Sequence, residues 1–254
     1  MEIISDYSLK YDFIKSITID SKFDMPLIEG RYGYLCNIGF DFLTKYCKSN
    51  NVDWEYMGLI DADTLVNNYY FHTLIKRMNI DYELGITSGI IYNKIKESYY
   101  IEKSLDYLPS GSGRLIRKKC FNDIKGYEIT PSPDSASIIK AILRGWKTKK
   151  YFDIASIQLR ETSSKEGLWN GYVFLGVGRY YYRTHPVILL LNVLQLVFSS
   201  KSFYTLAFLK GYVIGYLTNK PRTNDKEIIY YYKYIRPREI ILFIKNFIRN
   251  IVNI

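Results

Sequence analysis

The sequence predicts an α/β fold with a mixed, mainly parallel sheet flanked by helices, followed by a helical C-terminal extension. Apolar runs of strand length alternate with segments of helical spacing up to about residue 165, which is typical of a sheet covered on both faces. From residue 166 onward, apolar helical segments and basic residues replace this alternation. With 254 residues, 48% of them apolar, the chain can bury one substantial core with a smaller appendage. We therefore expect an α/β domain at 1–165 and a helical, basic extension at 166–254.

The first part of the chain predicts two strands, a loop and a helix. Met1 to Tyr7 and Ile14 to Ile19 have the residue types and alternation of short strands. Asp20 to Tyr34 contains proline and glycine and indicates a loop. Asn37 to Cys47 then has the apolar spacing of a helix that packs on a sheet.

Two carboxylates follow the next predicted strand. Tyr56 to Ile60 is an apolar run of strand length, Asp61-Ala62-Asp63 comes directly after it, and helical spacing begins at Asn67. In an open α/β sheet, ligands bind at the carboxyl ends of the strands. Paired carboxylates at such a position suit Mg²⁺ or Mn²⁺ with a diphosphate completing the ligand shell. The alternative is that Asp63 or Thr64 merely caps the following helix.

A further strand and a glycine-rich turn come next. Leu84 to Tyr92 predicts a strand, and its two glycines indicate that a neighbouring segment approaches the backbone closely. Leu108 to Arg114 predicts a turn that opens into a strand or helix. Backbone N–H groups at Gly111, Ser112 and Gly113 could cradle a phosphate there. The alternative is a plain glycine-rich connection.

An acid lies in the first turn of the next predicted helix. Ser132 is a good helix cap, Pro133 a good first residue, and Asp134 follows them. The helix should end at Gly145-Trp146, because glycine is a common helix terminator. Asp134 is therefore a candidate functional carboxylate, although an acid at this position also complements the helix dipole.

The C-terminal extension predicts three helices. Pro186 to Phe198 and Phe203 to Leu217 are apolar segments too short to span a bilayer, so they either pack on the α/β domain or lie in a membrane interface. Glu239 to Ile254 gathers Lys, Arg and Asn on one narrow stripe. Such a helix suits an anionic membrane surface, and the alternative is a core helix with a solvated stripe.

Composition limits the partners and the compartment. The 35 Lys and Arg against 25 Asp and Glu leave a formal charge of +10, which favours an anionic partner such as a nucleotide, a phosphorylated lipid or a membrane surface. Nucleic acid is not expected, because the basic residues do not interleave with aromatic residues in any known module. Three cysteines without metal spacing favour a reducing compartment, and the first residues lack signal-peptide character. We expect a cytoplasmic protein that can be peripheral on the inner face of a membrane.

The order of these features resembles the inverting family 2 glycosyltransferases of GT-A fold, which is a Rossmann-type architecture. The likeness covers roughly Ile3 to Arg160. The motifs that carry it are Asn37-Ile38-Gly39, Asp61-Ala62-Asp63, the stretch from Pro109 to Tyr127, and Asp134 with Gly145-Trp146.

The resemblance implies a role for each matched residue. It implies a catalytic domain at 1–165 that transfers a sugar from a nucleotide-diphosphate donor, such as a UDP-sugar, to a glycan or lipid-linked acceptor with inversion. Inversion needs a base on the acceptor side of the sugar, and Asp134 is its candidate. The implied metal ligands for Mg²⁺ or Mn²⁺ are Asp61, Asp63 and Gln158. The implied donor-binding residues are Asp6, Asn37, Asp61 and Arg160, and the implied acceptor or sugar pocket contains Gly111, Ser112, Gly113 and Trp146. Arg114, Arg117 and Arg160 are unranked candidates for contacts to the phosphates of the donor.

Three departures from the family pattern define the alternative. The strand and helix that normally precede the region like Ile3 to Ser8 are missing, so the domain is expected to be shortened at its N-terminus. Pro133-Asp134 stands where the family has a Glu-Asp pair, and Gln158 stands where a metal-binding histidine is often found. The alternative function is a catalytically degenerate, glycosyltransferase-like scaffold or membrane-associated subunit.

Overall fold

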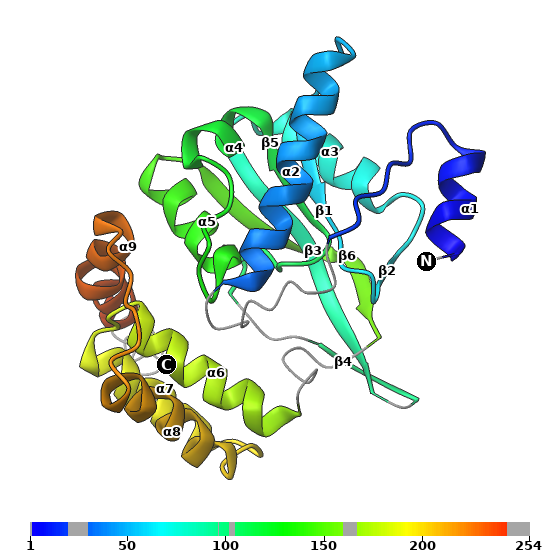
Figure 1. Cartoon of the computed structure of the whole chain (residues 1–254). Coiled ribbons are helices and arrows are strands. Elements are labelled where there is room, and N and C mark those ends of the chain that lie inside the picture. Colours follow the sequence, from blue (N-terminus) through cyan, green and yellow to red (C-terminus); the bar gives the residue numbers. More distant parts are fainter. Residues whose placement is uncertain (1, 20–29, 96, 102–104, 160–166, 243–254) are drawn as a thin grey trace, which may run out of the picture.

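The chain folds into a mixed sheet flanked by helices (Figure 1). The computed structural model describes residues 2–19, 30–95, 97–101, 105–159 and 167–242. The helices are α1 Glu2–Lys10, α2 Arg31–Ser49, α3 Tyr70–Ile80, α4 Lys118–Ile124, α5 Pro133–Leu143, α6 Leu168–Tyr181, α7 Pro186–Val197, α8 Tyr204–Leu217, α9 Lys226–Tyr230 and the π-helical turn η2 Tyr231–Ile235. The strands are β1 Tyr56–Leu59, β2 Thr64–Val66, β3 Leu84–Ile95, β4 Ser98–Ile101, β5 Arg114–Arg117 and β6 Lys147–Gln158.

The sheet is mixed rather than mainly parallel, so that part of the prediction is wrong. Its order is β1-β5-β3-β6-β2, with β4 paired to β3 outside this path. Within the described residues only β3 and β6 pair in parallel, and the β1/β5, β2/β6, β3/β4 and β3/β5 pairs are antiparallel. The antiparallel partners β2 and β5 are three and four residues long. Strands this short leave little periodicity in a sequence, which is why the alternation of longer elements suggested a parallel sheet.

The expected N-terminal strands are also wrong. Residues 2–10 form helix α1, and residues 14–19 have no regular secondary structure. In the described part of the chain these residues lie outside the sheet, and Ile3 and Leu9 are exposed. Strand preference reflects packing against a neighbouring strand, and without one the helical spacing of Ile3, Ile4 and Tyr7 prevails.

The helix after the first loop begins earlier than expected. Residues 20–29 of the predicted loop lie outside the described residues, and Arg31 to Tyr34 already belong to α2. The left-handed φ of +96° at Gly30 opens this helix. The strands at β1 and β3 and the helices α5, α7 and α8 confirm their predictions within a few residues.

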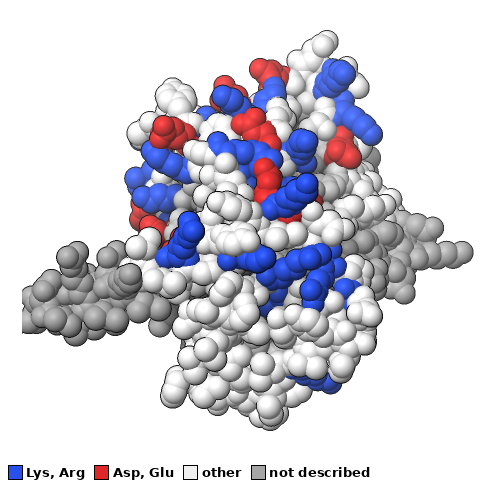
Figure 2. Space-filling model, turned by 90° about the vertical axis from the view of Figure 1, so that its left-hand side faces the viewer, with Lys and Arg blue, Asp and Glu red and all other residues white. Residues whose placement is uncertain are grey.

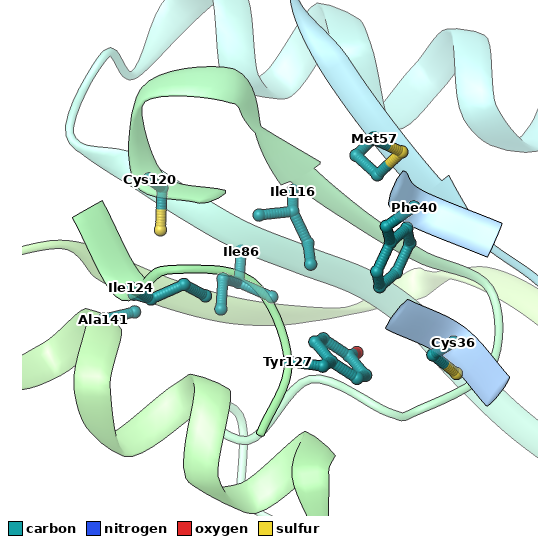
Figure 3. Packing of buried hydrophobic residues seen from close by; sticks show 9 residues of the cluster. All are labelled: Cys36, Phe40, Met57, Ile86, Ile116, Cys120, Ile124, Tyr127 and Ala141. Carbon is teal, nitrogen blue, oxygen red and sulfur yellow. The ribbon is translucent and has the colours of Figure 1, made fainter. Parts of the chain in front are cut away.

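One apolar cluster joins the sheet to the helices on one face. It contains Cys36 and Phe40 from α2, Met57 from β1, Ile86 from β3, Ile116 from β5, Cys120 and Ile124 from α4, Tyr127, and Ala141 from α5 (Figure 3). Burial raises the pKa of the Cys36 and Cys120 thiols to about 12, so both remain neutral and serve as packing groups. The third cysteine, Cys47, is only partly buried.

The helices after residue 167 form a separate layer beside the sheet (Figure 1). Helices α6 and α8 lie in close contact, since a Cβ on Gly176 would stand 2.0 Å from the Phe208 carbonyl oxygen. None of the helices in the described part of the chain is long and apolar enough to cross a membrane. Residues 236–242 continue as a helix after η2, whereas most of the predicted basic stripe lies at 243–254, outside the described residues.

Candidate active site

The acidic turn lies at the end of β1, as the sequence predicts. Asp61-Ala62-Asp63 leaves β1 and leads directly into β2, with the Thr64 amide donating to the Asp61 carbonyl at 3.0 Å. Because Thr64 begins a strand, the helix-cap alternative is wrong. Leu59 pairs with Arg114 in the antiparallel β1/β5 ladder, so the turn emerges at the same edge at which β5 begins.

The glycine-rich turn is therefore brought beside the acidic turn. The Ser112 hydroxyl accepts a hydrogen bond from the Asp61 amide at 2.9 Å and donates one to the Thr64 hydroxyl at 2.8 Å. Ser112 is buried between them. Ser112, which lies between two glycines, therefore links the glycine-rich turn to the acidic turn.

Asp134, in the first turn of α5, lies against the glycine-rich turn. A Cβ on Gly111 would stand 2.5 Å from Asp134 Oδ2, so only glycine allows this approach. The Tyr127 hydroxyl donates to Asp134 Oδ1 at 3.0 Å, and Arg114 Nη1 lies 3.6 Å from the same oxygen. The Asp134 side chain keeps 31% of its surface exposed, so the carboxylate is held firmly yet open to solvent.

Tyr32 of α2 contacts the acidic turn. Its hydroxyl donates to Asp61 Oδ1 at 3.1 Å. Burial raises the pKa of Tyr32 far above its ordinary value, and the negative charges of Asp134 and Asp61 add to this increase. Burial likewise raises the pKa of Asp61, and Asp134 and Asp63 raise it further against the hydrogen bond from Tyr32. The three carboxylates therefore share one electrostatic neighbourhood, and we call Asp61, Asp63 and Asp134 the carboxylate cluster.

The guanidinium of Arg114 joins the segments that surround the carboxylate cluster. Its side chain is fully buried. Its guanidinium donates to the Pro109 and Ser110 carbonyls at 2.9 Å each, to the Ser137 hydroxyl at 2.8 Å, to the Tyr127 hydroxyl at 3.1 Å and to the Asp134 carbonyl at 3.3 Å. One cation thus joins the glycine-rich turn to the start of α5. The sequence suggested Arg114 as a phosphate ligand, and the structure commits its donors to the protein instead.

Arg117, the second arginine considered for phosphate contacts, is also committed to the protein. Arg117 donates to the carbonyls of Met78, Asp81 and Leu84 around the end of α3. Arg160 lies outside the described residues.

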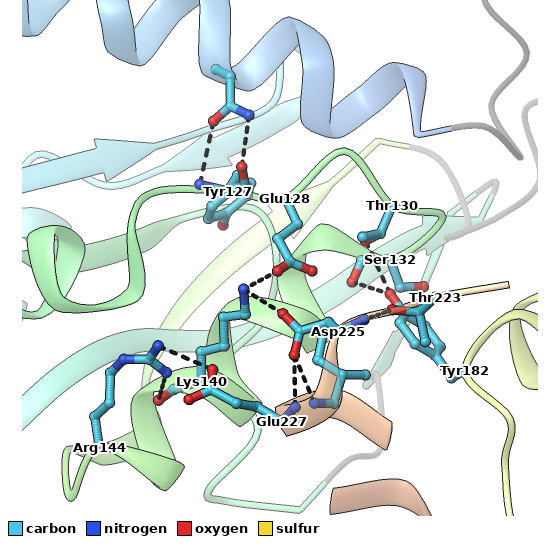
Figure 4. Close-up of polar contacts among 12 residues, drawn as sticks. Tyr127, Glu128, Thr130, Ser132, Lys140, Arg144, Tyr182, Thr223, Asp225 and Glu227 are labelled. Atoms are coloured by element: carbon cyan, nitrogen blue, oxygen red, sulfur yellow. Dashed lines mark hydrogen bonds and ion pairs between the residues drawn. The ribbon is translucent and has the colours of Figure 1, made fainter. Parts of the chain in front are cut away.

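The structure places the remaining predicted site residues in three different ways. Gln158 pairs with Thr64 in the β2/β6 register, so it lies beside the acidic turn as expected. Asn37 donates to the Tyr127 carbonyl at 2.7 Å and accepts from the Tyr127 amide at 3.3 Å, so it holds Tyr127 in place (Figure 4). Asp6 is exposed on α1, which stands apart from α5 in Figure 1, and is not brought to the cluster.

Gly113 and Trp146 do not line the cluster. Gly113 adopts a left-handed φ of +69°, and its carbonyl accepts from the buried Tyr70 hydroxyl at 2.8 Å. Trp146 follows α5, and its amide donates to the Ala141 carbonyl, seven residues or about 10 Å along the helix from Asp134. The Trp146 indole donates to Asp123 at 3.0 Å and packs on the apolar cluster of Figure 3. Both residues shape the fold rather than a pocket.

Residues of the C-terminal extension form ion pairs with helix α5. Lys140 of α5 forms ion pairs with Glu128 and, at 2.9 Å, with Asp225, and Arg144 pairs with Glu227 at 3.0 Å (Figure 4). The Tyr182 hydroxyl donates to the Ser132 carbonyl at 3.0 Å. We call the contacts made by Tyr182, Asp225 and Glu227 the α5 latch, because they fix the helix that carries Asp134 to the extension.

The donor set fits a hard divalent cation held with few protein ligands. Asp61 and Asp63 are only partly buried, and the raised pKa of Asp61 means that a positive charge nearby would relieve its unfavourable ionisation. Among the described residues, no group of three or more His, Cys, Asp or Glu side chains is arranged to hold a metal. Mg²⁺ often takes only one or two carboxylates with waters and substrate phosphates, so the Asp61 and Asp63 pair with the Gln158 amide nearby is compatible with it.

Fold and site together define an α/β protein with a carboxylate cluster at one edge of a mixed sheet. No family model matches the chain, and a comparison with characterised proteins gives no match either. Its function is therefore argued from the cluster itself. Sequence reasoning missed Tyr32, since it fell in a predicted loop, and it passed over Tyr127, whose position after Gly126 was the one available signal.

Proposed function

We propose that the chain is a metal-assisted, inverting glycosyltransferase of GT-A type. It would transfer a sugar from a nucleotide-diphosphate donor, such as a UDP-sugar, to a glycan or lipid-linked acceptor. One observation carries this proposal: Asp134, held by Tyr127 and partly open to solvent, lies in the same electrostatic neighbourhood as the Asp61 and Asp63 pair. A base beside a cation site is what sugar transfer from a diphosphate requires.

Asp134 is the base in this proposal. The acceptor hydroxyl oxygen attacks the anomeric carbon, its proton passes to Asp134, and the bond between that carbon and the diphosphate oxygen breaks with the electron pair leaving on the diphosphate. Tyr127 donates to Oδ1, so Oδ2, which faces Gly111, is the oxygen suited to take the proton. A bound Mg²⁺ or Mn²⁺ would neutralise the charge that develops on the diphosphate.

The residues around the base have defined supporting roles. Burial raises the pKa of Tyr127 well above its ordinary value, so this tyrosine stays protonated and keeps donating to Asp134. Asn37 fixes the Tyr127 backbone, and Gly111 leaves space beside the carboxylate. Asp61 and Asp63, with Gln158 beside them, would hold the cation.

The test is nucleoside diphosphate release from a panel of nucleotide sugars, with Asp134→Asn as the key variant. A general base contributes about 10²–10⁴-fold, so we expect a loss of this size in kcat with donor binding retained. Asp153→Asn is the matched control, because Asp153 forms an exposed ion pair with Arg77. An Asp134→Asn protein with wild-type turnover would remove the proposed base.

Donor binding provides a second, independent readout. Calorimetric titration with UDP should show tighter binding with Mn²⁺ than without it, and Asp63→Ala should cancel the difference. If no nucleotide sugar binds in a saturable manner with either metal, the proposal is wrong and the non-catalytic scaffold takes its place.

A further inference from the structure

We infer that helices α7 and α8 form a docking face for an anionic phospholipid membrane, on which the protein lies without crossing it. This inference concerns a different surface from the carboxylate cluster and does not depend on the proposed activity.

Each of the two helices carries a continuous stripe of exposed apolar side chains. On α7 the stripe recurs every three or four residues and contains Val187, Leu190, Leu194 and Val197, with Phe198 at the helix end. On α8 it contains Leu206, Val213 and Leu217, with Phe203 just before the helix. Leu190, Leu206 and Leu217 are 57%, 62% and 79% exposed. Apolar side chains recurring on the outer side of two contacting helices indicate a face that another apolar phase covers.

The charges of residues 167–224 indicate that the apolar phase covering this face is a membrane with anionic lipids. Residues 167–224 contain no Asp or Glu, and they contain six basic residues: Arg179, Arg183, Lys201, Lys210, Lys220 and Arg222. Figure 2 shows the result, since the lower part of the molecule, where α6 to α8 lie in Figure 1, is almost free of acidic colour and a band of Lys and Arg runs along its upper border. A surface of this composition attracts anionic lipid headgroups.

Lys210 adds an exposed positive charge to the apolar stripe of α8. It lies four residues after Leu206 and three before Val213, so it belongs to the exposed stripe of α8 and is itself exposed. A lysine can bury its methylene stem among acyl chains while its ammonium reaches the phosphates. A second copy of the chain would instead bring six further cations against these six, so charge favours lipid over self-association.

The dimensions of the helices agree with lying in the interface. Helix α7 has 12 residues and α8 has 14, which corresponds to about 18 and 21 Å, whereas a bilayer core is about 30 Å thick. Helices too short to span the bilayer can instead lie along it, with their exposed apolar side chains in the boundary between headgroups and acyl chains.

Vesicle flotation of the full chain tests the inference. We expect the protein to float with vesicles of phosphatidylcholine mixed with phosphatidylglycerol, to float much less with phosphatidylcholine alone, and to dissociate as NaCl is raised. Leu190→Glu should lower the partition coefficient at least about tenfold, the effect of keeping one leucine out of the membrane. Ile80→Glu is the control, because Ile80 is 74% exposed at the end of α3 and should tolerate the same change.

A charge pair separates lipid attraction from general stickiness. Lys210→Glu should weaken flotation on the anionic vesicles about fivefold or more, whereas Lys76→Glu, exposed on α3, should not. The circular dichroism spectrum and Tm of each variant must match wild type, which these exposed positions should allow. Absence of flotation, equal losses in the α3 controls, or a stable dimer that Leu190→Glu dissociates would each overturn the inference.

Discussion

Replacing Arg114 by Met should destabilise the fold severely, because one buried cation holds the turn before β5 and the start of α5 together. The side chain has no exposed surface, and its guanidinium donates five hydrogen bonds within the described structure and lies 3.6 Å from Asp134 Oδ1. Arg114→Met leaves the Pro109 and Ser110 carbonyls without this donor, and breaking a buried, hydrogen-bonded ion pair typically costs about 3–5 kcal/mol. Since domains are stable by about 5–15 kcal/mol, the loss is a large fraction of the total.

Urea unfolding monitored by circular dichroism measures the loss directly, and Tm should fall by roughly 6–20 °C. Arg77→Met is the control, because its ion pair with Asp153 is 44% and 60% exposed and should contribute less than about 1 kcal/mol. Arg114→Lys keeps the charge but not the planar fork, so its stability should lie between wild type and Arg114→Met. A loss below about 1 kcal/mol for Arg114→Met would refute the role assigned to this residue.

Two further predictions concern the α5 latch and the carboxylate cluster. Lys140→Met leaves the carboxylates of Glu128 and Asp225 beside α5 without their shared cation and should lower the unfolding free energy by about 2 kcal/mol. Lys147→Met is the control, because the Lys147 ion pair is exposed and its loss should change the unfolding free energy little. Equal effects of the two variants in urea unfolding would argue against the latch. Asp61→Asn should raise Tm at neutral pH in the absence of metal, since the raised pKa of Asp61 means that its ionised form is disfavoured in the fold. The folded state holds this proton more tightly than the unfolded state, so the gain should vanish as pH falls below the unfolded pKa of about 4; a gain independent of pH would exclude this cause.

The sequence predicted several long elements because their patterns are long, but it did not predict strand β6 or helix α6, which have 12 and 14 residues. Strand β3 and helices α5, α7 and α8 each repeat an apolar period over several turns or pleats, and each lies close to its expected position. The prediction failed where the signal was short or ambiguous. Strand β2 has three residues directly after the acidic turn, and its antiparallel pairing with β6 has no counterpart in local sequence.

Site residues that act through their own chemistry were easier to predict than those that act through contacts. Asp61, Asp63 and Asp134 stand out as acids at element ends, and the structure brings them into one neighbourhood. Tyr32 acts only because α2 carries it across the sheet to Asp61, and no feature of its surroundings in sequence indicates that. Trp146 shows the reverse error, since its place in a motif suggested a pocket while the helix before it carries it away from Asp134.

The support around Asp134 also bears on the simplest alternative, that this acid merely complements the dipole of α5. Dipole stabilisation needs only a negative charge somewhere in the first helical turn, at a solvated position. Asp134 has further contacts that a dipole effect does not need. Tyr127 donates to its Oδ1, and Arg114 donates to its backbone carbonyl. Glycine at position 111 leaves the space that its carboxylate occupies. The same structure then sets this carboxylate near two others, which raises the energy of the cluster. A fold selected for stability alone would separate these charges, so the arrangement favours chemistry at Asp134 over a purely structural acid.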